Sequence, residues 1–174
     1  MQPLSSPQST DTATLVEHIL ARFHDAHRRD LPALVAQAQA LQASVDGADP
    51  GDLAALRALP TRLQALASGL ELHMFKEEMR LFPMMEQGGN TLMVHLIQDL
   101  GEEHARHDAE VAALHADARQ VLARVAAGAP TGAGPQVQAQ ALLSLLDRFV
   151  DDLAQHMHIE DDVLFARYRP AQPG

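Results

Sequence analysis

A ten-residue pattern occurs twice in this sequence, at residues 73–82 and again at residues 156–165. Both copies place His, Met, Glu, Leu and Phe at the same offsets, and an acidic residue follows the Glu each time. A His and a Glu four residues apart lie on one face of an α-helix, one turn above the other. The two copies therefore predict two helices, each of which presents a chelating pair for a transition metal.

Four long segments of the chain space their apolar residues three or four apart, which is typical of helices that bury one face in a bundle. Loops rich in small and polar residues separate these segments at residues 45–51, 87–90 and 128–135. We therefore predict an all-α protein with the architecture of an antiparallel up-down-up-down four-helix bundle. The same pattern gives the expected boundaries: a disordered leader at 1–10, the bundle at 11–169 and a flexible tail at 170–174.

The apolar rows also make two local predictions. Pro32 interrupts the first helix, where the loss of a backbone donor predicts a kink or a broken turn. The core row of the last helix is predicted to continue its spacing through Leu153, His156, Glu160 and Val163.

Composition excludes several classes of protein and of site. The chain has 174 residues, only 3% aromatic residues and no Trp, which suits one helical domain with a full apolar core. It has no Cys, so disulfides and thiolate metal sites are excluded. A net charge of -10 without a basic cluster argues against a nucleic-acid partner. There is no apolar run long enough to cross a bilayer and no signal-peptide pattern, so we expect a cytoplasmic protein without membrane contact.

Six polar residues continue the apolar rows of the four helices, and they fall at one depth. Counted from helix ends that share one end of such a bundle, each of the four histidines lies 12 or 13 residues away, or about 20 Å at 1.5 Å per residue. Buried ionisable groups are costly unless they are paired or bind a metal. We therefore predict that these six residues are metal ligands: His24, His73, Glu77, His104, His156 and Glu160.

Two ions use six ligands from four helices more naturally than one ion does. Each helix with the His-x-x-x-Glu pair would give an imidazole to one ion and a carboxylate able to bridge both. Positions would remain for water, an oxo or hydroxo bridge, or a small molecule. Nitrogen and oxygen ligands suit iron, manganese or zinc, and the mixed set with room for a bridge favours two non-haem iron ions.

Other histidines and one acid complete the expected site or lie outside it. Candidates for residues that orient the ligands are His27, His107 and Glu103. The histidines that lie off the core rows are expected on the surface: His18, His95, His115 and His158.

The sequence resembles the hemerythrin-like, or HHE, cation-binding bundles over roughly residues 12–168. The likeness is carried by residues 22–32, 73–83, 102–104 and 156–165. Within that family it is similar to the di-iron proteins that repair iron-sulfur clusters after nitrosative or oxidative damage. The resemblance implies that the family's di-iron ligands correspond to the same six residues.

Two departures from the family pattern matter. Many repair proteins carry a small N-terminal domain with a cysteine pair, whereas this sequence has no Cys, so a repair step that needs thiols would depend on a partner. Oxygen-carrying hemerythrins use a His followed five residues later by Asp, and His156 and Asp161 match that spacing. Glu160 continues the core row, while Asp161 is turned about 100° away, so we favour Glu160 as the ligand.

The resemblance implies a role in the response to nitrosative or oxidative stress. The iron ions would repair iron-sulfur centres through chemistry with nitric oxide or oxygen, or by donating iron, and damaged iron-sulfur proteins would be the partners. The alternative is a reversible carrier or sensor of oxygen or nitric oxide, of hemerythrin type and without turnover. Storage of the ferritin kind ranks low, because the Glu-x-x-His motif occurs nowhere in the sequence. Catalytic turnover and oligomeric state are left open.

Overall fold

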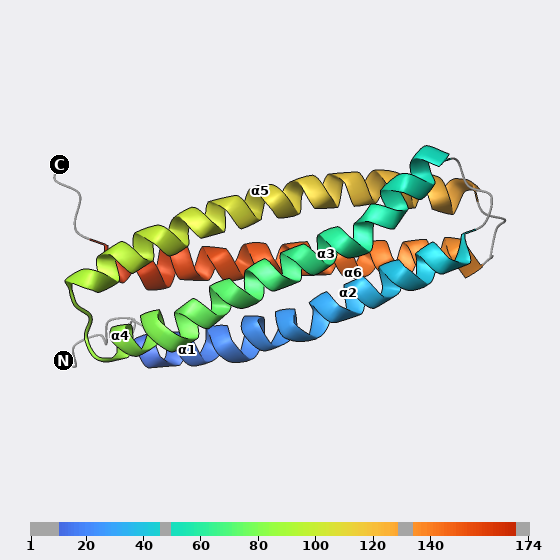
Figure 1. Cartoon of the computed structure of the whole chain (residues 1–174). Helices are drawn as coiled ribbons and strands as arrows, with labels where there is room; N and C mark the ends of the chain where they lie inside the picture. Colours follow the sequence, from blue (N-terminus) through green and yellow to red (C-terminus); the bar gives the residue numbers. More distant parts are fainter. Residues whose placement is uncertain (1–10, 46–49, 129–133, 170–174) are drawn as a thin grey trace, which may run out of the picture.

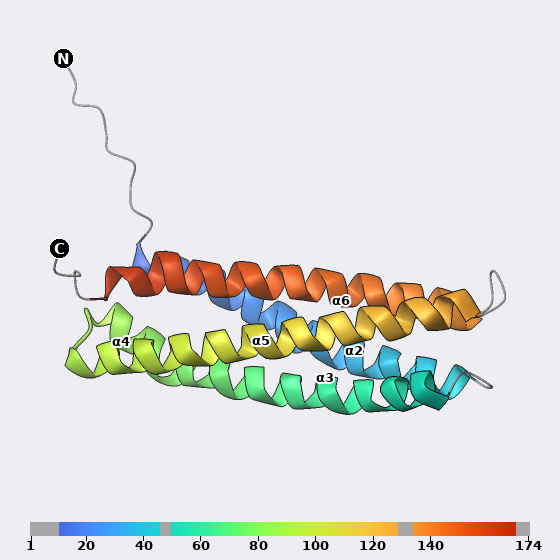
Figure 2. The same cartoon turned by 90° about the horizontal axis from the view of Figure 1, so that it is seen from above.

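The computed structural model of the chain consists of four long helical segments packed side by side (Figures 1 and 2). The structure describes residues 11–45, 50–128 and 134–169. The leader and the tail predicted at 1–10 and 170–174 lie outside these ranges. Within the described ranges every regular element is helical, so the predicted all-α bundle is confirmed.

The elements follow one another in chain order as α1 (Thr12–Ile19), η1 (Leu20–His24), α2 (Asp25–Ser44), α3 (Pro50–Lys76), η2 (Glu77–Leu81), α4 (Phe82–Glu86), α5 (Thr91–Gly128), α6 (Gly134–His158), η3 (Ile159–Leu164) and η4 (Phe165–Arg167). Three of them, η1, η2 and η3, are π-helical turns that continue the preceding α-helix without a break; η1 and η2 lead into a further α-helix and η3 into the 3-10 turn η4. The bundle therefore has four continuous helical segments, which we call rods: α1–α2, α3–α4, α5 and α6–η4. Contacts join α2 to α3, α3 to α5, α5 to α6 and α6 to α2, and neighbouring rods are antiparallel (Figure 1).

The first rod does not break at its proline. Pro32 lies inside α2, which runs on as one α-helix to Ser44. A proline removes one backbone donor, and the apolar face of α2 offsets that loss by packing Leu31, Leu34 and Val35 into the core. The broken turn considered for this position is absent.

A polar layer divides the apolar core in two. The larger apolar cluster fills the bundle between α2, α3, α5 and α6. The smaller one lies at the other end, where α1, α4, the start of α5 and η3 meet, and it includes Ile19, Phe82 and Leu164. Among the residues that the structure describes, the buried polar side chains lie between these two clusters along the rods: His24, His27, His73, Glu77, His104, His156 and Glu160.

The core row predicted for the last helix is wrong at its end. Val163 is 38% exposed, whereas the next residue, Leu164, is completely buried. The reason is the π-helical turn η3. A π turn closes its hydrogen bonds one residue further along than an α turn does, so the face that follows it is displaced by one position.

None of the described helices is both long enough and apolar enough to cross a membrane.

Candidate metal centre

The polar layer is assembled from all four rods, and the π-helical turns lie at its level. His24 ends η1, Glu77 begins η2 and Glu160 lies in η3. Such turns are rare and occur frequently at functional sites, because they redirect side chains within an otherwise regular helix. The six residues predicted from the sequence all meet in this layer, and each is at most 3% exposed: His24, His73, Glu77, His104, His156 and Glu160.

These six side chains form two overlapping sets of four. One set joins His24 and His156 to both glutamates, and the other joins His73 and His104 to the same glutamates. Within each set, one nitrogen or oxygen atom of every residue lies within 4.8 Å of the others. We call the two sets the His24–His156 half-site and the His73–His104 half-site.

Glu77 turns one carboxylate oxygen toward each half-site. Its Oε2 lies 3.5 Å from Nε2 of His24, while its Oε1 lies 3.2 Å from Nε2 of His73 and 3.7 Å from Nε2 of His104. A carboxylate in this position can bridge two cations.

Glu160 repeats the arrangement from the opposite rod. Its Oε1 lies 3.0 Å from Nε2 of His156 and 3.7 Å from Nε2 of His24. Its Oε2 lies 3.2 Å from Nε2 of His104. Both glutamates therefore offer one oxygen to each half-site.

Four histidines of the layer point Nε2 toward its centre, and we call them the inner histidines: His24, His73, His104 and His156. Each is held at Nδ1 by a residue of another rod. The distances from Nδ1 are 2.7 Å for His24 to Glu78, 3.0 Å for His73 to Glu103, 2.9 Å for His104 to Asp161 and 3.2 Å for His156 to His27. Because the outer partner occupies Nδ1, the tautomer that leaves the Nε2 lone pair facing the centre is favoured.

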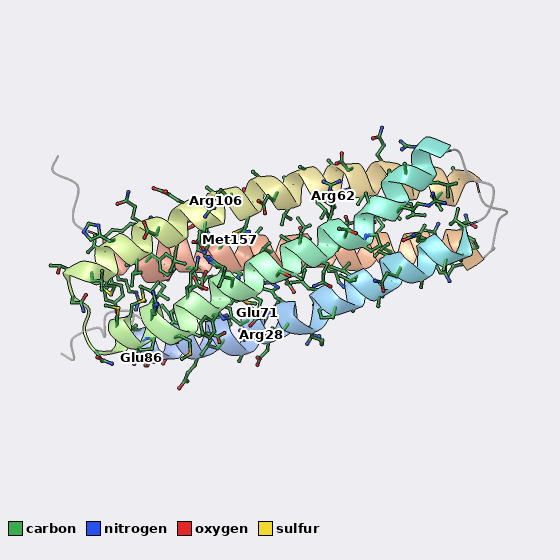
Figure 3. The ribbon with its side chains drawn as sticks, viewed as in Figure 1. Arg28, Arg62, Glu71, Glu86, Arg106 and Met157 are labelled. Carbon is green, nitrogen blue, oxygen red and sulfur yellow. The ribbon has the colours of Figure 1, made fainter. Side chains whose placement is uncertain are left out.

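Each outer carboxylate is in turn paired with a cation. Arg28 donates to Glu78, Lys76 to Glu103 and Arg169 to Asp161. Arg28 also makes an ion pair with Glu71 at 2.9 Å, and the two side chains lie together on the outside of the bundle in Figure 3. Three of the four inner histidines are therefore backed by an ion pair.

Several atoms at the centre lack a hydrogen-bond partner among the described residues. They are both carboxylate oxygens of Glu77 and of Glu160, and Nε2 of His73 and of His104. Leaving buried acceptors unpaired costs free energy, on the order of 1–3 kcal/mol each. A cation bound at each half-site would satisfy these atoms, and nitrogen and oxygen donors without sulfur suit iron, manganese or zinc. The residues present thus fit two metal ions.

Without a metal, this layer holds protons. Burial lowers the pKa of His104, but the hydrogen bond with Asp161 and the nearby carboxylates of Glu160 and Glu77 outweigh it and raise the pKa to about 12. Burial acts to raise the pKa of Glu160, but the nearby imidazoles hold it well below its ordinary value. A metal that binds here must displace a proton from the layer.

His27 behaves differently from the inward-facing imidazoles. Burial, together with the neighbouring imidazoles of His156 and His24, lowers the pKa of His27 to about 3. The ring is neutral at physiological pH, so it orients His156 without adding charge.

The structure separates the three residues predicted to orient the ligands. His27 and Glu103 lie at ring nitrogens of the inner histidines. His107 instead lies edge-on to the ring of His73, with centroids 5.5 Å apart, and its own buried Nδ1 has no hydrogen-bond partner among the described residues. It does not reach Nδ1 of an inner histidine.

Two residues that hold inner histidines were not predicted as such, Glu78 and Asp161. The sequence did contain a signal, because both are the acid that follows the Glu of the repeat. Of the histidines expected on the surface, three are exposed: His18, His95 and His158. His115 is instead half-buried and lies 2.6 Å from Asp147.

Surface grooves reach the outer residues of the layer, and two of them are lined by its histidines. One, of about 610 Å³, lies between α2 and α3 and is lined by His27, Arg28 and Met74 among others. The other, of about 350 Å³, lies between α5 and the end of the last rod and is lined by His104 and Asp161 among others. The grooves therefore bring solvent to the edge of the layer on two sides of the bundle.

Comparison with known proteins gives a family match over nearly all of the chain. The model of the hemerythrin HHE cation binding domain matches residues 15–127 and 95–174. The chain is 35% identical over 153 residues to the iron-sulfur cluster repair protein DnrN of Neisseria gonorrhoeae, covering 87% of this chain and 88% of that protein.

Two further relatives are longer than this chain. It is 32% identical over 164 residues to the iron-sulfur cluster repair protein YtfE of Cronobacter sakazakii, covering 92% of this chain and 67% of the relative. It is 28% identical over 159 residues to a probable iron-sulfur cluster repair protein of Haemophilus influenzae, covering 91% of this chain and 66% of the relative. The chain thus spans about two thirds of the length of these two proteins.

Proposed function

The chain belongs to the hemerythrin HHE cation-binding family, and on that premise we propose that it is a non-haem di-iron protein that takes part in the repair of iron-sulfur centres. The observation that carries this proposal is the sharing of Glu77 and Glu160 between two half-sites. Each glutamate offers one oxygen to either side, which is the arrangement that two bridged ions require. A single ion would leave one pair of imidazoles and two carboxylate oxygens buried without a partner.

The residues of the layer have separate tasks in this proposal. The four inner histidines would hold the ions through Nε2, and Glu77 and Glu160 would each offer one oxygen to either ion. The outer residues keep each ring in place and supply negative charge on three sides. The apolar clusters above and below the layer keep bulk water away, which strengthens every electrostatic interaction inside it. Bound iron would supply redox chemistry and a coordination position for a small diatomic molecule, nitric oxide or oxygen.

The names of the relatives support the repair of iron-sulfur clusters as the process. Two routes are consistent with the layer. Iron could remove the damaging molecule through chemistry with nitric oxide or oxygen, or iron could be donated to a damaged cluster. Damaged iron-sulfur proteins would be the partners on either route, and the cytoplasm the compartment.

A repair assay tests the proposal. The iron-loaded protein is mixed with an iron-sulfur enzyme inactivated by nitric oxide, and enzyme activity is followed with time. We expect recovery with the wild type, none with His156→Ala, and full recovery with His95→Ala. His95 is a matched control because it is exposed and is not one of the residues of the layer. Equal recovery with His156→Ala would contradict the proposal.

The same mixture separates the alternative function. A reversible adduct of the protein with oxygen or nitric oxide, without recovery of the enzyme, would support a carrier or sensor of hemerythrin type. The grooves that reach His27 and His104 from opposite sides are compatible with access of such small molecules.

A further inference from the structure

In the His73–His104 half-site, both imidazoles are backed by a carboxylate. Nδ1 of His73 lies 3.0 Å from Oε2 of Glu103, and Nδ1 of His104 lies 2.9 Å from Oδ2 of Asp161. The cations beside these carboxylates bind the other oxygen of each, Oε1 of Glu103 and Oδ1 of Asp161. Each imidazole therefore faces an oxygen that its neighbouring cation leaves free. A carboxylate at Nδ1 raises the basicity of the imidazole as a metal ligand.

The His24–His156 half-site is backed more weakly at both imidazoles. Nδ1 of His156 lies 3.2 Å from Nε2 of His27, and an imidazole brings no negative charge whether or not it is protonated. His24 does face a carboxylate, but the oxygen of Glu78 that lies 2.7 Å from its Nδ1 also accepts from Arg28 at 2.8 Å. A guanidinium on the same oxygen makes that oxygen a poorer acceptor for the imidazole.

From this asymmetry we infer that the two half-sites take up metal in a fixed order, with the His73–His104 half-site first, and that His27 is the positioning residue that sets the order. The inference rests on the proposed function only in that the six residues hold two ions. The bridging glutamates are common to both half-sites, so they favour neither. Loss of one outer partner typically changes metal affinity 10–100-fold, and we expect the two dissociation constants to differ by a factor on the order of 10–100.

Zinc is a suitable probe, because it accepts nitrogen and oxygen ligands and has no redox chemistry. The metal-free full chain, labelled with nitrogen-15, is titrated with zinc, and the ring nitrogens of each histidine are followed by two-bond proton–nitrogen correlation spectra. We expect Nε2 of His73 and of His104 to shift to the metal-bound position during the first equivalent. Nε2 of His24 and of His156 should follow only during the second equivalent.

Three variants assign the order to its cause. His27→Glu supplies the missing carboxylate, and Glu103→Gln removes one from the other half-site, so each should make the two half-sites fill together. His107→Gln is the matched control, because this half-buried ring lies against His73 without contacting an inner Nδ1, and it should leave the order unchanged. Circular dichroism and the thermal melt of each metal-free variant establish that the bundle is intact.

Three results would overturn the inference: simultaneous filling in the wild type, filling of the His24–His156 half-site first, or an unchanged order in a folded His27→Glu or Glu103→Gln variant. If one charge-changing variant does not fold, the other still decides the matter. Failure of the proposed function is distinguishable, since then no inner histidine would bind zinc at all, or zinc would bind in the predicted order and the repair assay alone would fail.

Discussion

Nδ1 of His24 lies 2.7 Å from Oε1 of Glu78, which joins the first rod of the bundle to the second at the level of the metal centre. The same kind of contact joins each rod to the next around the bundle: Nδ1 of a histidine on one rod lies beside an orienting residue on the next. The last of these contacts joins His156 on the last rod to His27 on the first. The contacts that orient the ligands are therefore also the contacts that fix how the rods are placed at this depth.

Glu78→Gln should weaken metal binding while leaving the fold intact. The amide keeps the size of the side chain but removes the negative charge at Nδ1 of His24, which we expect to lower metal affinity by a factor on the order of 10–100. The measurement is competition with a chelator of known affinity. Glu71→Gln is the control, because Glu71 binds the same Arg28 yet is exposed and touches no inner histidine. An equal loss in both variants would point to Arg28 rather than to the imidazole.

The number of iron ions bound per chain should depend on both half-sites. We expect about two irons per chain in the wild type. His73→Ala and His156→Ala should each lose most of this iron, since each removes one imidazole and leaves the shared glutamates with a cation on one side only. Metal analysis of protein purified in parallel gives the ratio. Full iron content in both variants would show that the ligands have been assigned wrongly.

Removal of the metal should lower the thermal stability of the chain. A ligand that binds only the folded state at 100 times its dissociation constant adds about 2.7 kcal/mol, which for a chain of this length corresponds to a shift of about 5–10 °C in Tm. Calorimetry with and without a chelator measures the shift. His156→Ala should show no comparable response, and an unchanged wild-type melt would mean that the buried layer is stable without metal.

Metal affinity should rise with pH across the neutral range. Without metal, the hydrogen bond with Asp161 and the nearby carboxylates of the glutamates overcome the effect of burial and raise the pKa of His104 to about 12. This ring therefore carries a proton at pH 7 that a metal must displace. Because the displaced proton is released, higher pH favours the metal-bound form. Titration calorimetry with zinc in two buffers of different ionisation enthalpy should show release of at least one proton. Identical heats in both buffers would contradict the prediction.

The layer itself could be predicted because its residues continue the apolar rows of their own helices. His73 and Glu77 lie one turn apart on a face whose other members are leucines, so burial and mutual proximity follow from helical periodicity alone. Depth along the rods then places them with His24 and His104. This reasoning uses only properties of single helices and their connections.

The outer contacts could not be predicted in the same way, because they depend on how one rod is rotated against the next. The acid after each repeated Glu was visible in the sequence. Whether Glu78 and Asp161 point to solvent or to a histidine depends on how the adjacent rod is rotated and shifted along its axis. The π-helical turns were also missed, since a spacing of 3.6 residues per turn gives no indication of a widened turn. That omission explains the wrong position given to Val163.

The widened turn η3 can be tested with two neighbouring residues. If the helix were a regular α-helix here, Val163 would face the core and its truncation would be the costly one. In the structure Leu164 is fully buried and Val163 is 38% exposed, so Leu164→Ala should lower the free energy of unfolding by about 2–5 kcal/mol. Val163→Ala should cost less than about 1 kcal/mol. Urea denaturation of the metal-free protein measures both losses without a contribution from metal binding. A larger loss for Val163→Ala would contradict the π-helical turn and, with it, the position of Glu160 at the centre of the layer.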